Sequence, residues 1–186
     1  MKRIIETIVA LVVLLVSVSL ADAQGAPVPQ TGQTTSFATG DDGDLQKGVA
    51  LPDPRFTDNL NGTITDNLTG LIWLQNANCF GAQVWAQALA GANGLDSGQC
   101  GLTDGSVAGD WRLSNVRELY SLVDHGTFSP SLPAGHPFAD FRASGYWSST
   151  TVAGFPANAG GVGFFTGGVF NFGKTNFSFV LPVRGP

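Results

Sequence analysis

The stretch FTDNLNGTITDNLTGLIWL, residues 56–74, contains two turn signals between short β-branched or apolar segments. Asn and Gly recur in its segments 59–62 and 67–70, and both residue types tolerate the backbone conformations of tight turns. The segments between these turns are β-branched or apolar, as expected for strands. The stretch therefore predicts a meander of three short antiparallel strands at residues 56–58, 63–66 and 71–74.

The next region has the spacing of an amphipathic helix. Its apolar residues fall at i, i+3, i+4 and i+7, which is one face of a helix with 3.6 residues per turn, at Trp85, Ala88, Leu89 and Ala92. Asn93-Gly94 supplies a stop signal. This pattern predicts the first helix of the domain and assigns Trp85 to the core.

A second helix is predicted after Asn115, which suits an N-cap and is followed three residues later by Glu118, as in a capping box. We expect this helix to end at Gly126, with a buried face formed by Val116, Leu119, Tyr120 and Val123. Arg112 stands between Trp111 and Leu113, so its guanidinium is expected to meet an internal carboxylate or carbonyl.

The last third of the chain changes to the period of strands. Residues 146–150 predict a strand, residues 154–161 a loop, and residues 162–165 and 169–172 a hairpin around Thr166-Gly167-Gly168. From Phe177 to Val183 apolar residues occupy every second position. Pro182 should stand at a sheet edge or near a strand end. Together these patterns predict the element order meander, helix, helix and sheet.

The chain begins with the pattern of a secretory signal peptide. Basic Lys2 and Arg3 precede an uncharged apolar run over residues 7–20, which is shorter than the roughly 20 residues of a membrane-spanning helix. Small residues at Ala21 and Ala23 then place a cleavage site between Ala23 and Gln24. We therefore expect residues 1–23 to be removed on export to the periplasm or cell surface, with no membrane span left.

Residues 24–53 are rich in Gly, Thr, Gln and Pro and show no apolar periodicity, so they are expected to form a linker or an extended arm. Within them, Asp41, Asp42 and Asp44 gather three carboxylates, which are hard oxygen ligands suited to calcium. The later Glu of an EF-hand loop is missing. A solvated acidic turn is the alternative interpretation.

Two cysteines, Cys79 and Cys100, lie in the exported part of the chain. An even number of cysteines in an oxidising compartment predicts a disulfide. The bridge would close a loop of about 20 residues and contribute about 3 kcal/mol. A reactive or metal-binding pair is the alternative, although no Cys-x-x-Cys spacing supports it.

Composition excludes several classes of protein. The 186 residues are 43% hydrophobic and 12% charged, which is unlike a disordered chain. Nine Lys and Arg against fourteen Asp and Glu leave a formal net charge of −5. Binding of nucleic acid through phosphate neutralisation is therefore disfavoured.

Several phrases occur together in a recognisable order. They are the meander at residues 56–73, Gly109-Asp110-Trp111-Arg112-Leu113, Arg117-Glu118-Leu119, residues 146–150, and Leu181-Pro182-Val183-Arg184-Gly185. As a set, they resemble the family of the C-terminal domain of the Legionella collagen-like adhesin (Lcl) over residues 54–185. The resemblance implies a C-type-lectin-like α+β fold, with two helices packed on a twisted, mostly antiparallel sheet.

Some family features are absent from this sequence. The collagen-like stalk is missing, and the net charge of −5 disfavours binding of sulfated glycans. The Glu-Pro-Asn, Gln-Pro-Asp and Trp-Asn-Asp phrases of calcium-dependent lectins do not occur. The calcium mechanism of those lectins therefore does not transfer to this chain.

Three functional hypotheses follow. The first is a non-catalytic exported module that binds a glycan or a protein, with Tyr146 and Trp147 as candidate contacts because aromatic faces suit sugar stacking. The second is an enzyme resembling formylglycine-generating or sulfatase-modifying proteins, suggested by Trp111-Arg112-Leu113 before a helix with Glu118. Those enzymes use two late cysteines and copper, whereas Cys79 and Cys100 both precede the second helix. The third is an envelope scaffold with no small ligand.

Overall fold

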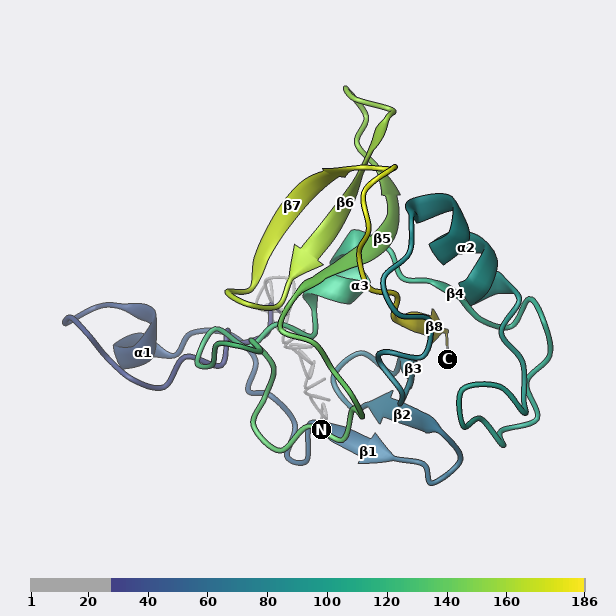
Figure 1. Ribbon diagram of the computed structural model, residues 1–186. Helices are drawn as coiled ribbons and strands as arrows, with labels where there is room; N and C mark the ends of the chain where they lie inside the picture. The colour runs from purple at the N-terminus through teal and green to yellow at the C-terminus, as the bar shows by residue number, and fades with distance from the viewer. Residues whose placement is uncertain (1–27, 186) are drawn as a thin grey trace, which may run out of the picture.

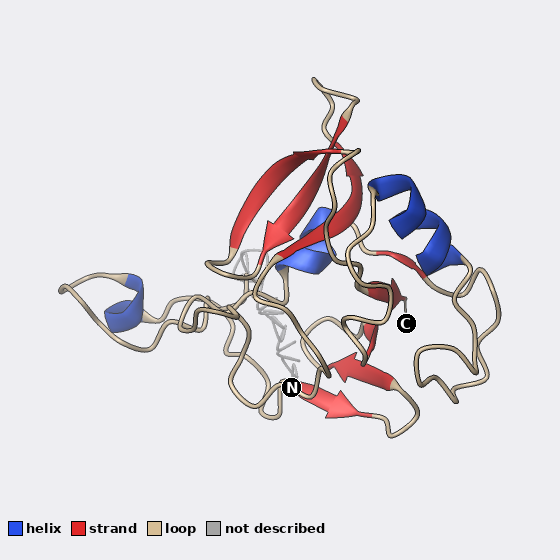
Figure 2. Ribbon diagram, viewed as in Figure 1, coloured by secondary structure: helices blue, strands red, loops and turns tan. Residues whose placement is uncertain are grey.

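A computed structural model describes residues 28–185 of the chain, so the expected signal segment and its Ala23–Gln24 cleavage site lie outside the described residues. Within residues 28–185 the fold is α+β, with short helices beside two antiparallel sheets (Figures 1 and 2). The α+β class is therefore confirmed. The strands form two separate sheets, whereas the resemblance implied a single twisted sheet.

The larger sheet has the strand order β1-β2-β3-β8-β4. Its strands are short and come from both ends of the domain: β1 (Phe56–Asp58), β2 (Thr63–Asp66), β3 (Ile72–Leu74), β4 (Arg112–Leu113) and β8 (Pro182–Arg184). The predicted meander is β1-β2-β3, with Ile64 opposite Trp73. Both of these side chains are fully buried and belong to the main core cluster.

The C-terminal strand β8 lies inside this sheet, between β3 and β4. Strand β8 pairs with β3 through Val183 and Trp73 and with β4 through Pro182 and Leu113. It is therefore an interior strand, although Pro182 stands at its first residue as its missing N–H requires. The alternating segment before Pro182 runs as single bridges, Gln83 with Ser178 and Tyr146 with Phe179.

The smaller sheet has the order β5-β6-β7, with β5 at Gly145–Thr151, β6 at Asn158–Gly163 and β7 at Gly168–Gly173. The expected strand at 146–150 and the hairpin are confirmed. The prediction of a loop over residues 154–161 is wrong from residue 158 onward, because residues 158–161 form the first four residues of β6. A Cβ on Gly161 would lie 2.6 Å from the carbonyl oxygen of Tyr146 and 2.8 Å from the Phe172 ring. Glycine is thus required by close packing inside the sheet.

Two helices cover the sheets (Figure 1). Helix α2 (Trp85–Asn93) buries Ala88 and Ala92, as its spacing predicts. Helix α3 (Val116–Tyr120) begins with the predicted capping box, in which the Asn115 side chain accepts from the backbone N–H groups of residues 117 and 118.

The extent of α3 differs from the prediction. The helix ends at Tyr120, with Ser121 as C-cap, well before Gly126. Of the expected apolar face only Leu119 is buried, and Tyr120 is exposed. After Tyr120 the backbone changes to i→i+3 bonds, from Leu122 to Leu119 and from Val123 to Tyr120, which tighten the last turn.

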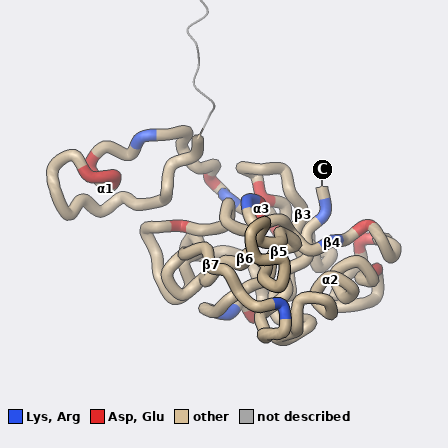
Figure 3. The backbone as a smooth tube through the Cα atoms, turned by 90° about the horizontal axis from the view of Figure 1, so that it is seen from above, with Lys and Arg blue, Asp and Glu red and all other residues tan. Residues whose placement is uncertain are grey.

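Residues 28–55 form an arm that projects from the side of the two sheets, as Figures 1 and 3 agree. The arm folds back on itself, because Val49 exchanges backbone hydrogen bonds with Val28 and Gln30. Its far end carries the short helix α1 (Asp42–Leu45). At its base the His125 N–H donates to the Thr31 carbonyl at 2.9 Å and anchors the arm to the domain.

Candidate functional site

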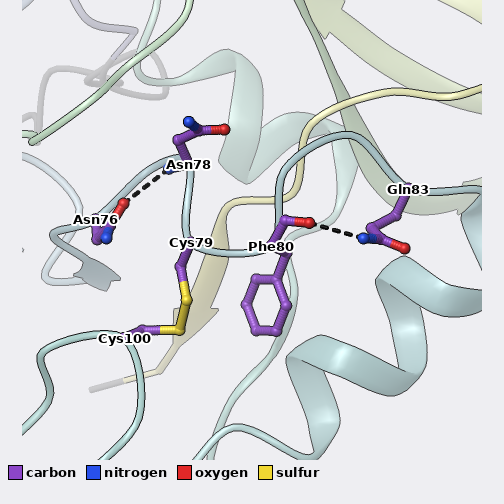
Figure 4. Close-up of a disulfide and its surroundings, with 6 residues drawn as sticks. All are labelled: Asn76, Asn78, Cys79, Phe80, Gln83 and Cys100. Carbon is purple, nitrogen blue, oxygen red and sulfur yellow. Dashed lines mark hydrogen bonds between the residues drawn. A yellow bond between two sulfur atoms is a disulfide. The ribbon is translucent and has the colours of Figure 1, made fainter.

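Cys79 and Cys100 form a disulfide with a Cα–Cα distance of 5.6 Å (Figure 4). The bridge ties the segment after β3 to the loop that follows α2. Hydrogen bonds on either side hold the segment of Cys79: the Asn78 N–H donates to Asn76 and the Gln83 amide donates to the Phe80 carbonyl. The predicted pairing is therefore confirmed, and the described residues 28–185 contain no free cysteine.

The two aromatic residues expected to contact a ligand are core residues. Tyr146 and Trp147 both have 0% of their surface exposed, so neither ring offers a face for stacking, and this expectation is wrong. Tyr146 packs beside Phe141 and Phe164, and burial raises the pKa of its phenol to about 12. Trp147 donates its indole N–H to the Gln83 carbonyl at 2.8 Å. Packing among apolar neighbours fixes both rings.

The three acidic residues of the arm lie at α1, where Figure 3 shows them as a red segment. Asp41 is the N-cap and accepts from the N–H groups of Phe37 and Ala38, and the Phe37 bond is the main reason that its pKa is lowered. Asp44 accepts from Gly40 N–H, and Asp42 accepts from the Thr31 hydroxyl. Among residues 28–185 no three acidic, His or Cys side chains gather as a metal site. The calcium interpretation of Asp41, Asp42 and Asp44 is not supported, because these carboxylates serve to cap and brace the arm.

The structure places a concavity where the arm meets α3. This cavity has a volume of about 470 Å³ and is called here the arm pocket; its principal lining residues are Val28, Leu51, Val116, Arg117, Tyr120 and Val169. One wall comes from the arm, the opposite wall from α3, and β7 contributes Val169. The volume is within the range of roughly 300–1,000 Å³ that is usual for small-molecule sites.

A buried ion pair supports the floor of the arm pocket. The Arg55 guanidinium donates to both Asp66 oxygens, at 2.7 and 2.9 Å, and also to the Ser121 carbonyl at 2.9 Å. Both side chains are almost completely buried. This arrangement fastens the end of α3 to β2, so the position of one pocket wall depends on Arg55.

The beginning of α3 is held by a second ion pair. Arg112 on β4 makes two hydrogen bonds of 2.7 Å with Glu118, which also accepts from the Asn115 N–H. The bonds from Arg112 lower the pKa of Glu118, and those to Glu118 raise the pKa of Arg112. The expectation that Arg112 meets a carboxylate is confirmed, and both ends of α3 are fixed.

Most polar groups of the arm pocket are already hydrogen-bonded within the protein. The Gln30 amide donates to the Gln46 carbonyl, the Thr31 hydroxyl donates to Asp42, and the Tyr120 hydroxyl lies 3.0 Å from His125 Nε2. Arg117 differs, because no side chain within the described range pairs with its guanidinium. The pocket is thus apolar, with one uncommitted cation at its border.

Sequence patterns gave only part of this site. The spacing of α3 predicted a buried apolar face that includes Val116, Tyr120 and Val123, and these residues line the pocket, with Val123 also packed against the main core cluster. The other wall was missed, because residues 24–53 have the composition of a linker. The isolated apolar residues Val28 and Leu51 in that polar segment were the available signal.

The second hypothesis required two reactive cysteines. Cys79 and Cys100 are joined to each other, so neither has a thiol to carry the reaction of the formylglycine-generating type.

His136, another titratable residue outside the pocket, is half-buried among Phe138 and Phe141, and burial lowers its pKa. It is isolated from the arm pocket and its lining.

The described residues form an α+β domain with one disulfide. Residues 62–184 match the family described as the Lcl C-terminal domain, which is more than half of the 186 residues. The chain therefore belongs to the Lcl C-terminal domain family. No curated protein matches the chain. No helix among residues 28–185 is long and apolar enough to cross a membrane.

Proposed function

We propose that this protein is an exported, non-catalytic recognition module that binds its partner in the arm pocket. The observation that carries the proposal is the cavity of about 470 Å³ that an adhesin-associated domain builds between its arm and α3. The Arg55–Asp66 and Arg112–Glu118 pairs hold the α3 wall, and the hydrogen bond from the His125 N–H to the Thr31 carbonyl joins the arm wall to the domain, so the pocket is preformed. A preformed pocket binds a ligand without the entropic cost of ordering its walls.

Several observations support export of the chain. An apolar, uncharged run after Lys2 and Arg3 has the pattern of a secretory signal. The Cys79–Cys100 disulfide fits an oxidising compartment such as the periplasm or the extracellular space. The C-type-lectin-like superfamily implied by the sequence resemblance is part of the same proposal.

The lining of the arm pocket supports recognition without chemistry. Its nucleophilic hydroxyl group on Ser121 donates to the Glu118 carbonyl, and Tyr120 is hydrogen-bonded to His125. Among residues 28–185, no carboxylate is hydrogen-bonded to the His125 ring in the way that orients a catalytic base. Because Tyr146 and Trp147 are fully buried, we expect a glycan or an apolar partner to contact the lining of this pocket instead.

The test is a binding screen that compares the native protein with a variant in which a large side chain fills the arm pocket. The exported chain is titrated, by calorimetry, with oligosaccharides, apolar peptides and acyl-chain anions. We expect at least one class to bind saturably and to lose binding in V169W, because Val169 is 51% exposed and lines the pocket. V107W is the matched control, since Val107 is 62% exposed and lies outside the pocket.

Two outcomes would contradict the proposal. Absence of saturable binding in all three classes would favour an envelope scaffold without a small ligand. Chemical conversion of the bound ligand, detected by mass spectrometry after incubation, would show an enzyme instead of a recognition module.

A further inference from the structure

The arm pocket has a chemical character that narrows the class of its ligand, provided that the proposed function holds. Its wall residues are mainly aliphatic: Val28, Pro29 and Leu51 from the arm, and Val116, Val123 and Val169 from the domain. Burying an apolar chain against such a wall is favourable by roughly 25 cal/mol per Å². The pocket therefore favours a ligand with an aliphatic body.

The same pocket offers few hydrogen bonds to a sugar. Gln30, Thr31, Tyr120 and Arg55 use their polar groups within the protein. A ligand hydroxyl that enters the pocket loses its hydrogen bonds to water and finds no partner in exchange, which is unfavourable. A ligand with many hydroxyl groups would meet this cost repeatedly, whereas an aliphatic chain would not.

Charge in the pocket favours an anion. No Asp or Glu is among its lining residues, although the chain as a whole has a net charge of −5. Arg117 borders the cavity from α3, and no ion pair within residues 28–185 neutralises its guanidinium. The other arginine of the lining, Arg55, is already paired, because its Nε and Nη2 groups donate to the Asp66 carboxylate. Arg117 is thus the group available to a negative head.

We propose that the arm pocket binds a single-chain amphiphile, with the acyl chain along the aliphatic wall and an anionic head at Arg117. A guanidinium binds a carboxylate or a phosphate through paired N–H groups. The head can therefore be the carboxylate of a free acyl chain or the phosphate of a single-chain phospholipid. These two sources share the recognition chemistry and are separated by the probes below.

The experiment titrates the exported chain with octanoate, octyl phosphate and octanol, each below its aggregation concentration, by calorimetry. Both anions should bind more tightly than octanol, by about tenfold, since one charged hydrogen bond contributes about 1.5 kcal/mol. The tighter of the two anions identifies the head group. R117Q should remove this preference, so that both anions bind about as tightly as octanol.

Control variants make the same change of charge outside the pocket, so that an effect on binding can be distinguished from an effect on folding. R142Q removes an exposed arginine that lies outside the pocket, so it should preserve the preference. V169E adds a carboxylate to the exposed pocket border and should weaken both anions by about tenfold more than octanol, whereas V107E should not.

Distinct results would overturn this inference. Equal binding of octanol and the anions, or unchanged anion binding in R117Q, would reject the role of Arg117. Saturable binding of an oligosaccharide or a peptide at the pocket, without binding of any octyl probe, would reject the amphiphile but leave the recognition function standing.

Discussion

Single residues fix the geometry around the arm pocket through buried polar contacts. Asp66 is fully buried and accepts from the Arg55 guanidinium, the Leu68 N–H and the Thr69 hydroxyl. All of these groups would be left without a charged acceptor if the carboxylate were lost. A buried charge without its partner is far more destabilising than the loss of an exposed pair.

We therefore expect Asp66→Asn to lower the free energy of unfolding by about 3–5 kcal/mol, because the Arg55 guanidinium stays buried without a counter-charge. Urea unfolding monitored by tryptophan fluorescence measures the change. Asp53→Asn is the control, since Asp53 is exposed, and its effect should stay within about 0.5 kcal/mol. Equal effects for the two variants would contradict this account of the ion pair.

At the level of single strands, the glycines of β6 leave room for the aromatic side chains of the neighbouring strand β7. The strand reads NAGGVG, and the aromatic rings of β7 lie over its glycines. The ring of Phe170 lies above Gly163 and the ring of Phe172 above Gly161. The small residues of β6 therefore make room for the large residues of β7.

Gly161→Ala should lower the free energy of unfolding by about 1–3 kcal/mol, because the new methyl group overpacks against backbone and ring atoms that cannot move freely. Thermal unfolding by circular dichroism gives the shift in Tm. Gly154→Ala is the matched control, since nothing lies within 4 Å of its added Cβ. A similar Tm for both variants would mean that β6 tolerates side chains at Gly161.

For the whole molecule, the Cys79–Cys100 bridge constrains the long connection through α2 that joins β3 to β4. The sequence separation of the two cysteines is 21 residues. A separate hydrophobic cluster packs against this bridge. It consists of Leu74, Leu95, Leu102 and Trp111. Bridge and packing together hold the loops that carry little regular structure.

The double variant C79S/C100S should unfold about 3 kcal/mol more easily, because opening the loop restores conformational freedom to the unfolded chain. Urea unfolding with and without reductant measures the difference. Reductant should destabilise the native protein to the same extent and should not affect the double variant. A native protein that is insensitive to reductant while its bridge is open would contradict this expectation.

The meander, the α2 face and the capping box of α3 could be read from the sequence, because they depend on local periodicity and turn chemistry. Residues 56–74 carry alternating strands and turns. The capping box joins Asn115 to Glu118, which is only three positions later in the sequence. The disulfide was also predictable, since the sequence has two cysteines, and neither has another partner of its kind. Each of these features is encoded within a short window or by composition.

The tertiary structure alone decided where Tyr146, Trp147 and the arm would lie. An exposed aromatic residue and a buried one look the same in a sequence, and only packing against Phe141, Phe164 and Phe172 buries these rings. The arm pocket joins Val28 and Leu51 to Val116 and Val169, which are far apart in the chain. Such long-range proximity results from the closure of the fold, so no local pattern of residues specifies it.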